Sequence, residues 1–199
     1  MGLDGGRLVL ASGNPGKLRE LSHVLEPLGI TIHSQADFDI DPVEETGLTF
    51  VENALIKARE AARVSRLPAL ADDSGLVVEA LNGRPGIHSA RYAGAQASDA
   101  DNNRKLLEEL ADLPMERRSA HFHCCLVLLR HAADPSPIIA EGRWHGHILE
   151  TARGSNGFGY DPLFHDRQLG ATAAELPMEE KARVSHRGQA LAALIERLS

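Results

Sequence analysis

Two adjacent carboxylates, Asp72 and Asp73, are the residues of this 199-residue chain that are best suited to chemistry. They follow an apolar run at 67–71, which is typical of a buried strand, and Gly75 comes soon after them. Adjacent strand residues point to opposite faces, so both acids can share one opening only if the strand ends here and Gly75 turns the backbone. Two close carboxylates repel each other unless a cation or a proton lies between them, and Mg²⁺ prefers oxygen ligands. The pair therefore indicates a magnesium site, with a helix N-cap made by Asp and Ser as the simpler alternative.

A strand, a glycine-containing loop and a helix follow one another near the start of the chain. Residues 7–11 are predicted as a buried strand, and apolar residues at three- and four-residue spacing predict a helix over 17–28. Backbone N–H groups and the positive end of such a helix can bind phosphate. A standard P-loop is excluded, because Ala11 replaces its first glycine and Leu18 replaces its Mg²⁺-binding hydroxyl residue. Residues 12–17 are therefore either a phosphate cradle of another kind or an ordinary strand-to-helix turn.

A second glycine-rich loop, at 154–162, contains two aromatic residues and one acid. Glycines allow a backbone to approach a ligand closely. Phe158 or Tyr160 could stack on a flat ring, and Asp161 could accept a hydrogen bond from a base or a sugar. The alternative is a hairpin turn whose aromatic rings anchor the core.

The last helix is predicted to begin at Ser185, a suitable N-cap, and to bury an apolar stripe that ends at Leu198. His186 and Arg187 would then lie at the mouth of this helix, where they could hydrogen-bond carbonyl oxygens or anions. Lys181 lies near a helical turn a few residues earlier.

Other predicted elements position these residues. Thr49 and Glu52 have the spacing of a capping box, which predicts a helix to about Val64, with Lys57 facing either water or a pocket. An acidic loop at 37–45 precedes this helix and is either solvated or lends a carboxylate to a metal. The remaining elements are a helix at 99–110 and strands at 30–34, 120–129 and, as a pair around Glu141-Gly142, 138–148.

Composition places the chain among globular proteins of one domain, or of one domain with two lobes. Hydrophobic residues make up 43% and charged residues 25%, and the net charge of −7 argues against a general nucleic-acid coat. A local basic pocket could still bind a small anionic molecule. No stretch resembles a signal peptide or a membrane helix, and the adjacent Cys124 and Cys125 fit a reducing compartment, so a cytoplasmic protein is expected.

Several stretches spread along the chain form one pattern. They are Ser12-Gly-Asn-Pro-Gly-Lys17, Glu45-Thr-Gly-Leu-Thr-Phe-Val-Glu-Asn53, Ala71-Asp-Asp-Ser-Gly-Leu76, Phe158-Gly-Tyr-Asp-Pro162 and Ser185-His-Arg-Gly188. In this order they closely resemble the inosine triphosphate pyrophosphatase (Ham1-like) family, and the resemblance covers almost the whole chain.

The resemblance implies an α/β fold with an elongated mixed central sheet flanked by helices, and two lobes around a substrate cleft. It implies a single domain over 1–199, Mg²⁺ dependence and a homodimer. It also implies an enzyme that hydrolyses non-canonical purine nucleoside triphosphates, (d)ITP and (d)XTP, to the monophosphate and pyrophosphate, and so cleanses the nucleotide pool.

Carried over by position, the resemblance assigns a role to each motif. Asp73 becomes the catalytic acid, which holds Mg²⁺ or activates the attacking water, with Glu44 as a second metal ligand and Glu45 and Asp72 as alternatives. Lys57 and Arg91 are additional candidates for phosphate contacts. The implied substrate-binding residues are Ser12, Gly13, Asn14, Pro15, Gly16 and Lys17 in the phosphate loop, Ser74, and, for base and ribose, Phe158, Gly159, Tyr160, Asp161, Lys181, His186 and Arg187.

Two other functions fit the same residues. One is a Maf-like pyrophosphatase, which acts on pyrimidine or modified nucleotides. The other is a nucleotide sensor of the same fold that binds without catalysis. Turnover of a panel of nucleoside triphosphates separates all three.

Overall fold

The computed structural model describes residues 6–198, so the predictions that concern the first five residues lie outside the described part of the chain. The described residues divide into two compact units. Unit 1 consists of residues 6–73, 125–141 and 190–198, and unit 2 of residues 74–124 and 142–189. No helix within 6–198 is long and apolar enough to cross a membrane.

Seven strands form one mixed sheet in the order β2-β1-β3-β4-β5-β6-β7. The β1–β2 and β1–β3 pairs are parallel, whereas the β5–β6 and β6–β7 pairs are antiparallel. The strands are β1 (Arg7–Leu10), β2 (Thr31–Ser34), β3 (Ala69–Val78), β4 (Ser119–Leu129), β5 (Ile138–Ile148), β6 (Phe164–Asp166) and β7 (Ala171–Thr172). The predicted α/β fold with a mixed sheet and flanking helices is confirmed.

Five α-helices accompany the sheet within the described chain. They are α1 (Pro15–Leu25), α2 (Phe50–Ser65), α3 (Asp99–Leu110), α4 (Met178–Val184) and α5 (His186–Leu198). The helix predicted over 17–28 ends earlier as an α-helix, because residues 26–28 form a 3₁₀ turn that is closed by Gly29 at φ 76°. The helix predicted over 99–110 has the bounds of α3.

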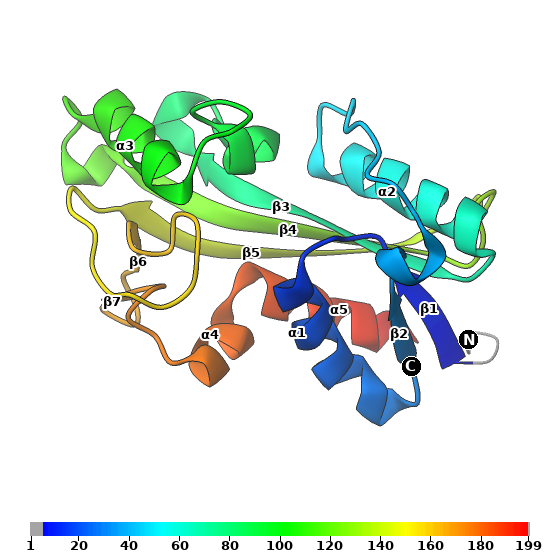
Figure 1. Cartoon of the computed structure of the whole chain (residues 1–199). Coiled ribbons are helices and arrows are strands. Elements are labelled where there is room, and N and C mark those ends of the chain that lie inside the picture. Colours follow the sequence, from blue (N-terminus) through cyan, green and yellow to red (C-terminus); the bar gives the residue numbers. More distant parts are fainter. Residues whose placement is uncertain (1–5, 199) are drawn as a thin grey trace. The chain divides into compact units, whose positions relative to one another are not determined.

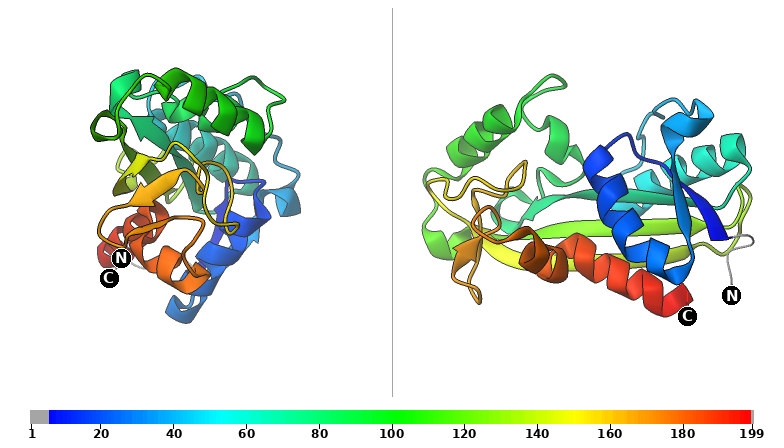
Figure 2. Two further views of the ribbon diagram at one scale, coloured as in Figure 1. Left: turned by 90° about the vertical axis from the view of Figure 1, so that its left-hand side faces the viewer. Right: turned by 60° about the horizontal axis from the view of Figure 1, so that its bottom comes forward.

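Unit 1 packs helices on both faces of its strands. Four alanines of α2, at 54, 58, 61 and 62, are buried against β1, β3 and β4, and their small size lets the helix approach the sheet closely. Helix α1 and the unit 1 part of α5 lie on the other face (Figures 1 and 2). Cys125 is fully buried in the α2 cluster, and burial raises the pKa of its thiol to about 12.

Unit 2 has its own core, in which α3 packs on the second half of the strands. Leu106 and Leu110 of α3 are fully buried with Leu76 of β3, Phe122 of β4 and Trp144 of β5. The Trp144 indole N–H donates to Asp166 at 2.7 Å, which satisfies the polar atom of a buried aromatic ring.

Strand β3 corrects the first prediction. It runs from Ala69 to Val78 without a break, so the expectation that the strand ends at Asp72 and Asp73 is wrong. The physical reason is that β4 lies alongside, and the apolar residues on both sides of the acids are buried. The strand that ends is β1, whose last residue, Leu10, pairs with Leu70. The acids therefore lie just beyond the carboxyl end of a neighbouring parallel strand.

Strand β5 corrects the predicted strand pair around Glu141-Gly142. Ile138–Ile148 is one strand, and burial alternates from Ala140 to His145. Ala140, Gly142 and Trp144 are buried, whereas Glu141 and Arg143 are exposed. Because the period of two continues through Gly142, this glycine makes no turn.

The sheet face opposite the unit 2 core holds a group of histidines. The His121 ring lies 5.3 Å from the ring of His145 and 6.2 Å from that of His123. The pKa of His121 is lowered to about 4, chiefly by burial and also by the positive charge of the neighbouring histidines and Arg143.

The low pKa of His121 predicts a loss of stability in acid. Between about pH 6.5 and 4 the unfolded chain binds a proton at His121 that the folded chain does not, so the free energy of unfolding falls as the pH falls. We expect a loss of about 1 to 2 kcal/mol, since solvent screens this half-buried ring. Urea unfolding of wild type and His121→Gln across this range measures it. His88→Gln, at an exposed histidine, is the control and should keep the wild-type slope.

Candidate active site

The loop between β1 and α1 is organised by the side chain of Asn14. Its Oδ1 accepts hydrogen bonds from the N–H groups of Gly16 at 2.8 Å and Lys17 at 3.3 Å, which makes Asn14 the N-cap of α1. Gly16 permits this cap, because a Cβ there would lie 3.0 Å from Asn14 Oδ1. The Asn14 N–H donates to the Ser12 hydroxyl at 3.2 Å, so the loop is closed by its own polar groups.

This cap changes how the loop can bind an anion. The sequence predicts a cradle of free N–H groups at the helix end, yet Asn14 already accepts from the N–H groups of Gly16 and Lys17. The next N–H, that of Leu18, donates to the Asn14 carbonyl at 3.2 Å. Anion binding here therefore depends on side chains and on the positive end of the helix dipole. The side chain of Pro15 lies outside what the structure describes.

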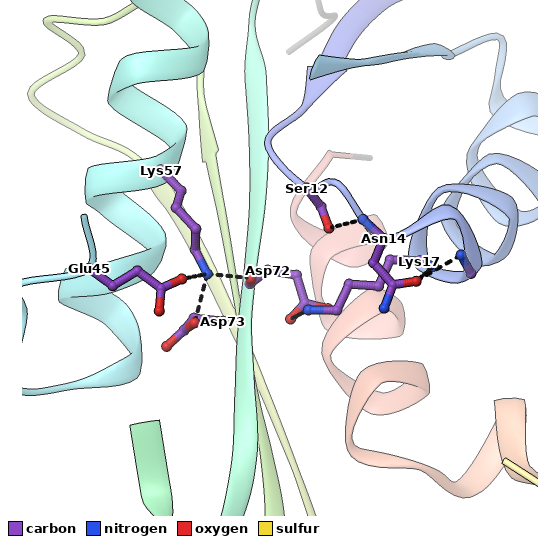
Figure 3. A network of polar contacts seen from close by, with 8 residues as sticks. Ser12, Asn14, Lys17, Glu45, Lys57, Asp72 and Asp73 are labelled. Atoms are coloured by element: carbon purple, nitrogen blue, oxygen red, sulfur yellow. Dashed lines mark hydrogen bonds and ion pairs between the residues drawn. The ribbon is translucent and has the colours of Figure 1, made fainter. Parts of the chain in front are cut away.

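The ammonium of Lys17 is paired with Asp72. Its Nζ lies 2.9 Å from Asp72 Oδ1, and the Asp72 side chain is fully buried. The pair joins the first turn of α1 to β3 on one side of the strand (Figure 3). A buried carboxylate of this kind needs a cation beside it.

Lys57 of α2 is the centre of a second network, on the other side of β3 (Figure 3). Its Nζ lies 2.7 Å from Asp73 Oδ1, 2.9 Å from Glu45 Oε1 and 3.0 Å from the Asp72 carbonyl oxygen. Burial alone would lower the pKa of Lys57, but the two carboxylates outweigh it and the pKa is raised. The Asp72 and Asp73 carboxylates thus leave β3 on opposite sides, each with its own lysine.

The second carboxylate oxygen of Asp73 differs from the first, which contacts Lys57. This second oxygen, Oδ2, is buried and has no hydrogen-bond partner among residues 6–198. Burial raises the pKa of Asp73; Lys57 opposes this rise, and the nearby carboxylates of Glu45 and Asp72 add to it. An unsatisfied buried carboxylate oxygen beside other acids is a position that a cation would satisfy.

The oxygens around Asp73 fit a hard cation that brings further ligands with it. No group of three or more His, Cys, Asp or Glu in the described chain is arranged to hold a metal alone. Mg²⁺ is usually bound by one or two carboxylates together with waters and substrate phosphates, so this donor set suits it. Glu45 lies at this network, whereas Glu44 is exposed and is not among the residues that line the pocket. The role of Glu44 as a metal ligand stays a prediction.

One pocket of unit 1, with a volume of about 330 Å³, brings these groups together. Lys17 and Lys57 line it, together with their partners Asp72 and Glu45. Asp73 contacts Lys57. The lining residues are Ala11, Ser12, Gly13, Asn14, Lys17, Gln35, Ile40, Asp41, Pro42, Val43, Glu45, Lys57, Glu60 and Asp72. Basic and acidic side chains around one opening can hold an anion and a cation side by side.

The glycine-rich loop of unit 2 forms a separate polar group. Asp161 Oδ2 accepts from the Phe158 N–H at 2.8 Å and from the Lys181 ammonium, so one oxygen joins the loop to α4. The Lys181 Nζ lies 5.4 Å from the centre of the Phe158 ring, which is 60% exposed. Gly157 is required here, because a Cβ would lie 2.1 Å from Asp161 Oδ2. An exposed ring held in place is suited to stacking on a flat ligand.

Two of the predicted loop residues have structural roles. Tyr160 is buried, and its hydroxyl donates to the Ser89 carbonyl at 2.8 Å, which favours the core-anchoring alternative for this ring. Gly159 has φ 62°, and α3 binds both its N–H and its carbonyl group.

Two further predicted residues lie outside this loop. Ser74 is half-buried in the middle of β3. Arg91 lies at the end of a 3₁₀ turn, and its phosphate contact stays a prediction.

The start of α5 is as predicted. The Ser185 hydroxyl accepts from the Gly188 N–H at 3.2 Å, and His186 stacks on Phe122 with ring centres 4.9 Å apart. Arg187, the next residue in the sequence, is buried in the first turn of the helix. Gly188 allows the α4–α5 turn, since a Cβ would lie 1.9 Å from the Ala182 carbonyl oxygen.

Sequence reasoning left Lys57 and Glu45 as secondary candidates, although the structure makes them central. The spacing of α2 alone could not orient Lys57. The signal that existed was the position of Lys57 one helical turn after Asn53, the last residue of the motif at 45–53, since residues four apart share a helix face. Asn53 is itself fully buried, and its Oδ1 accepts from the Gly47 N–H at 2.8 Å, which holds the segment that carries Glu45.

Fold and site together define an α/β protein in which a pocket lined by acidic and basic side chains lies at the carboxyl end of the parallel strand β1. The model of the Ham1 family matches residues 8–197. The dITP/XTP pyrophosphatase of Mannheimia succiniciproducens is 59% identical over 194 residues, which are 96% of this chain and 98% of that protein. The protein of the same name from Escherichia coli K12 is 55% identical, with the same shares covered.

Solved structures agree with these matches. The HAM1 protein from Coxiella burnetii superposes with a TM-score of 0.93 at 50% identity, over 96% of this chain and 98% of that one. The nucleoside-triphosphatase, dITP/XTP pyrophosphatase, from Mycobacterium abscessus has a TM-score of 0.81 at 48% identity, over 97% and 100% of the two chains. The protein belongs to the Ham1 family.

The Lys57 network predicts that two substitutions differ in their effect on stability. Lys57→Met leaves buried carboxylates without their cation and should lower the free energy of unfolding by about 3 kcal/mol. Asp73→Asn keeps an oxygen for Lys57 and removes one of several crowded charges, so it should stay within about 1 kcal/mol of wild type. Chemical denaturation at neutral pH measures both. Equal stability of Lys57→Met and wild type would contradict the network.

Proposed function

We propose that this protein hydrolyses non-canonical purine nucleoside triphosphates, dITP/ITP and dXTP/XTP, to the nucleoside monophosphate and pyrophosphate. The activity would remove these nucleotides from the pool. The observation that carries the proposal is the buried Oδ2 of Asp73, which has no hydrogen-bond partner among residues 6–198 and lies beside a pocket that contains two lysines. The names of the relatives, dITP/XTP pyrophosphatase, support the substrate class.

The unit 1 pocket would act on the triphosphate. Lys17 and Lys57 supply positive charge to an otherwise acidic chain, and the Ser12 hydroxyl can donate a hydrogen bond to a phosphate oxygen. Both lysines are paired with acids, so a phosphate would compete with carboxylates for cations that are already positioned. Attack at the α-phosphorus would release pyrophosphate as one unit.

Asp73 would be the catalytic residue, and Mg²⁺ the cofactor. Asp73 with either Glu44 or Glu45 would hold the ion through carboxylate oxygens. An ion held there would supply positive charge beside the phosphates and would acidify a water molecule. Asp73 Oδ2 is the atom that can accept the proton of the attacking water, since no other group of the described chain occupies it.

The unit 2 residues would recognise the base. Phe158 presents an exposed ring for stacking, and Lys181, His186 and Arg187 can donate to the carbonyl at the purine 6-position. Adenine carries an amino group there, which leaves buried donors unpaired at a cost of about 1 to 3 kcal/mol each. Guanine has the same carbonyl, so discrimination against GTP must come from its 2-amino group.

The family resemblance extends the proposal to the whole protein. Residues 1–199 would act as one enzyme domain, in the cytoplasm and as a homodimer. Light scattering on the purified protein would measure its mass directly, and a monomer would contradict the homodimer.

A panel of nucleoside triphosphates tests the proposed activity. With Mg²⁺ present, pyrophosphate should be released rapidly from ITP and XTP and slowly from GTP, ATP and dTTP. Asp73→Asn should lose at least about 100-fold in kcat while remaining folded. A preference for dTTP would favour a Maf-like activity instead. Tight binding of ITP without turnover would favour a nucleotide sensor.

Arg187 should contribute to the choice of base. Because its guanidinium would donate to the 6-carbonyl, Arg187→Ala should lower the ratio of kcat/KM for ITP over ATP by about 10-fold. The exposed Arg183, on α4, is the matched control, and Arg183→Ala should leave the ratio unchanged. Equal losses of kcat/KM for ITP and ATP in Arg187→Ala would remove this residue from base recognition.

A further inference from the structure

The stacking loop of unit 2 is flexible by composition but held from outside. Phe158 lies between Gly157 at φ 78° and Gly159 at φ 62°, and its ring is 60% exposed. Neither burial nor regular secondary structure therefore fixes the ring. Before this segment, the Asn156 N–H donates to the Ala174 carbonyl at 3.0 Å, and after it Tyr160 is anchored in the core.

The start of α3 forms two hydrogen bonds with the peptide groups of Gly159, and this pair of bonds is called the grip below. Asp99 Oδ2 accepts from the Gly159 N–H at 2.7 Å, and Asn103 Nδ2 donates to the Gly159 carbonyl at 2.8 Å. Asp99 and Asn103 are four residues apart, so they share one face of α3, and that face lies against the loop (drawn in yellow in Figure 1). One glycine is thus bound through its donor and its acceptor by a single helical turn.

Helix α3 is a firm support for this grip. Leu106 and Leu110 on the following turns are fully buried in the unit 2 core. Within the loop, Asp161 holds the Phe158 N–H, and the α3 contacts hold the next peptide group, that of Gly159.

We propose that Asp99 and Asn103 are positioning residues for the purine, which hold the Gly159 peptide and thereby fix the Phe158 ring for stacking on the base. The inference rests on the proposed function, because it names how that site binds its substrate. Neither residue touches the base. Stacking on an aromatic face tolerates every purine, so the grip controls affinity and leaves the choice among purines to other residues.

This role makes a specific kinetic prediction. Asp99→Ala should raise KM for ITP and for ATP alike, by about 3- to 10-fold, which is the value of one hydrogen bond. The kcat should stay within about twofold, and the ITP/ATP ratio of kcat/KM should be unchanged, since the lost binding is common to ground state and transition state. Asp99→Asn retains an oxygen acceptor and should restore the wild-type KM.

Two further variants separate positioning from stability. Asp101→Ala breaks the Ser98 capping box on the same turn without touching the loop, so it should lower stability and leave KM unchanged. Asn103→Leu removes the donor to Gly159 together with Asn103 Oδ1, a buried oxygen without a hydrogen-bond partner in the described chain. It should therefore raise KM with little loss of stability.

A measurement without substrate tests the grip itself. Hydrogen exchange at the Gly159 amide of the full-length protein should be about 10-fold faster in Asp99→Ala than in wild type or Asp101→Ala. Unchanged exchange and unchanged KM in Asp99→Ala would overturn the inference while the wild type still turns over ITP. A wild-type protein without ITP turnover would instead overturn the proposed function, and the exchange rates would still decide whether α3 holds the loop.

Discussion

The unit 1 site depends on the contacts of one ammonium group, that of Lys57. It lies within 3.0 Å of two carboxylate oxygens and a main-chain carbonyl, and it joins α2 to β3 and to the segment before α2. Buried acids would otherwise repel one another and take up protons. With the lysine present, Asp73 is held in place while its second oxygen stays without a hydrogen-bond partner in the described chain. The network thus fixes the carboxylate by one oxygen and leaves the other oxygen without a partner among residues 6–198.

The location of this network follows from where the strands end. Parallel strands β1 and β3 stay paired only as far as Leu10 and Leu70, and β3 continues past its neighbour. Beyond that point the side chains of β3 face the start of α1 on one side and α2 on the other (Figure 3). Each acid meets a lysine from a different helix. A regular sheet therefore separates two adjacent acids into two environments without any turn in the backbone.

Sequence patterns predicted most of this architecture, because strong periodicity and caps act locally. The helix at 99–110, the start of α5 at Ser185 and the strand near Arg7 follow from apolar spacing and capping residues. The errors occurred where a neighbouring strand decides the outcome. Nothing in 67–76 reveals that β4 continues the ladder past Asp73, and nothing in 138–148 reveals that Gly142 is buried in a continuous strand.

Side-chain partners were harder to predict than elements. The loop at 12–17 was correctly placed between a strand and a helix, but its predicted free N–H groups are capped by Asn14. Lys57 was left facing either water or a pocket, since the choice depends on acids that are distant in the sequence. The residues that hold Gly159 come from α3, more than 50 positions earlier, and only the folded chain brings them together.

The adjacent cysteines offer a different use of the same structure. Cys124 belongs to unit 2 and Cys125 to unit 1; both side chains are fully buried, and neither forms a disulfide within the described chain. A thiol with a pKa near 12, such as Cys125, is almost entirely protonated at neutral pH and cannot attack an alkylating reagent until its surroundings open. Chains that keep only one of the two thiols would therefore report, by their labelling rates, on the opening of each unit in turn.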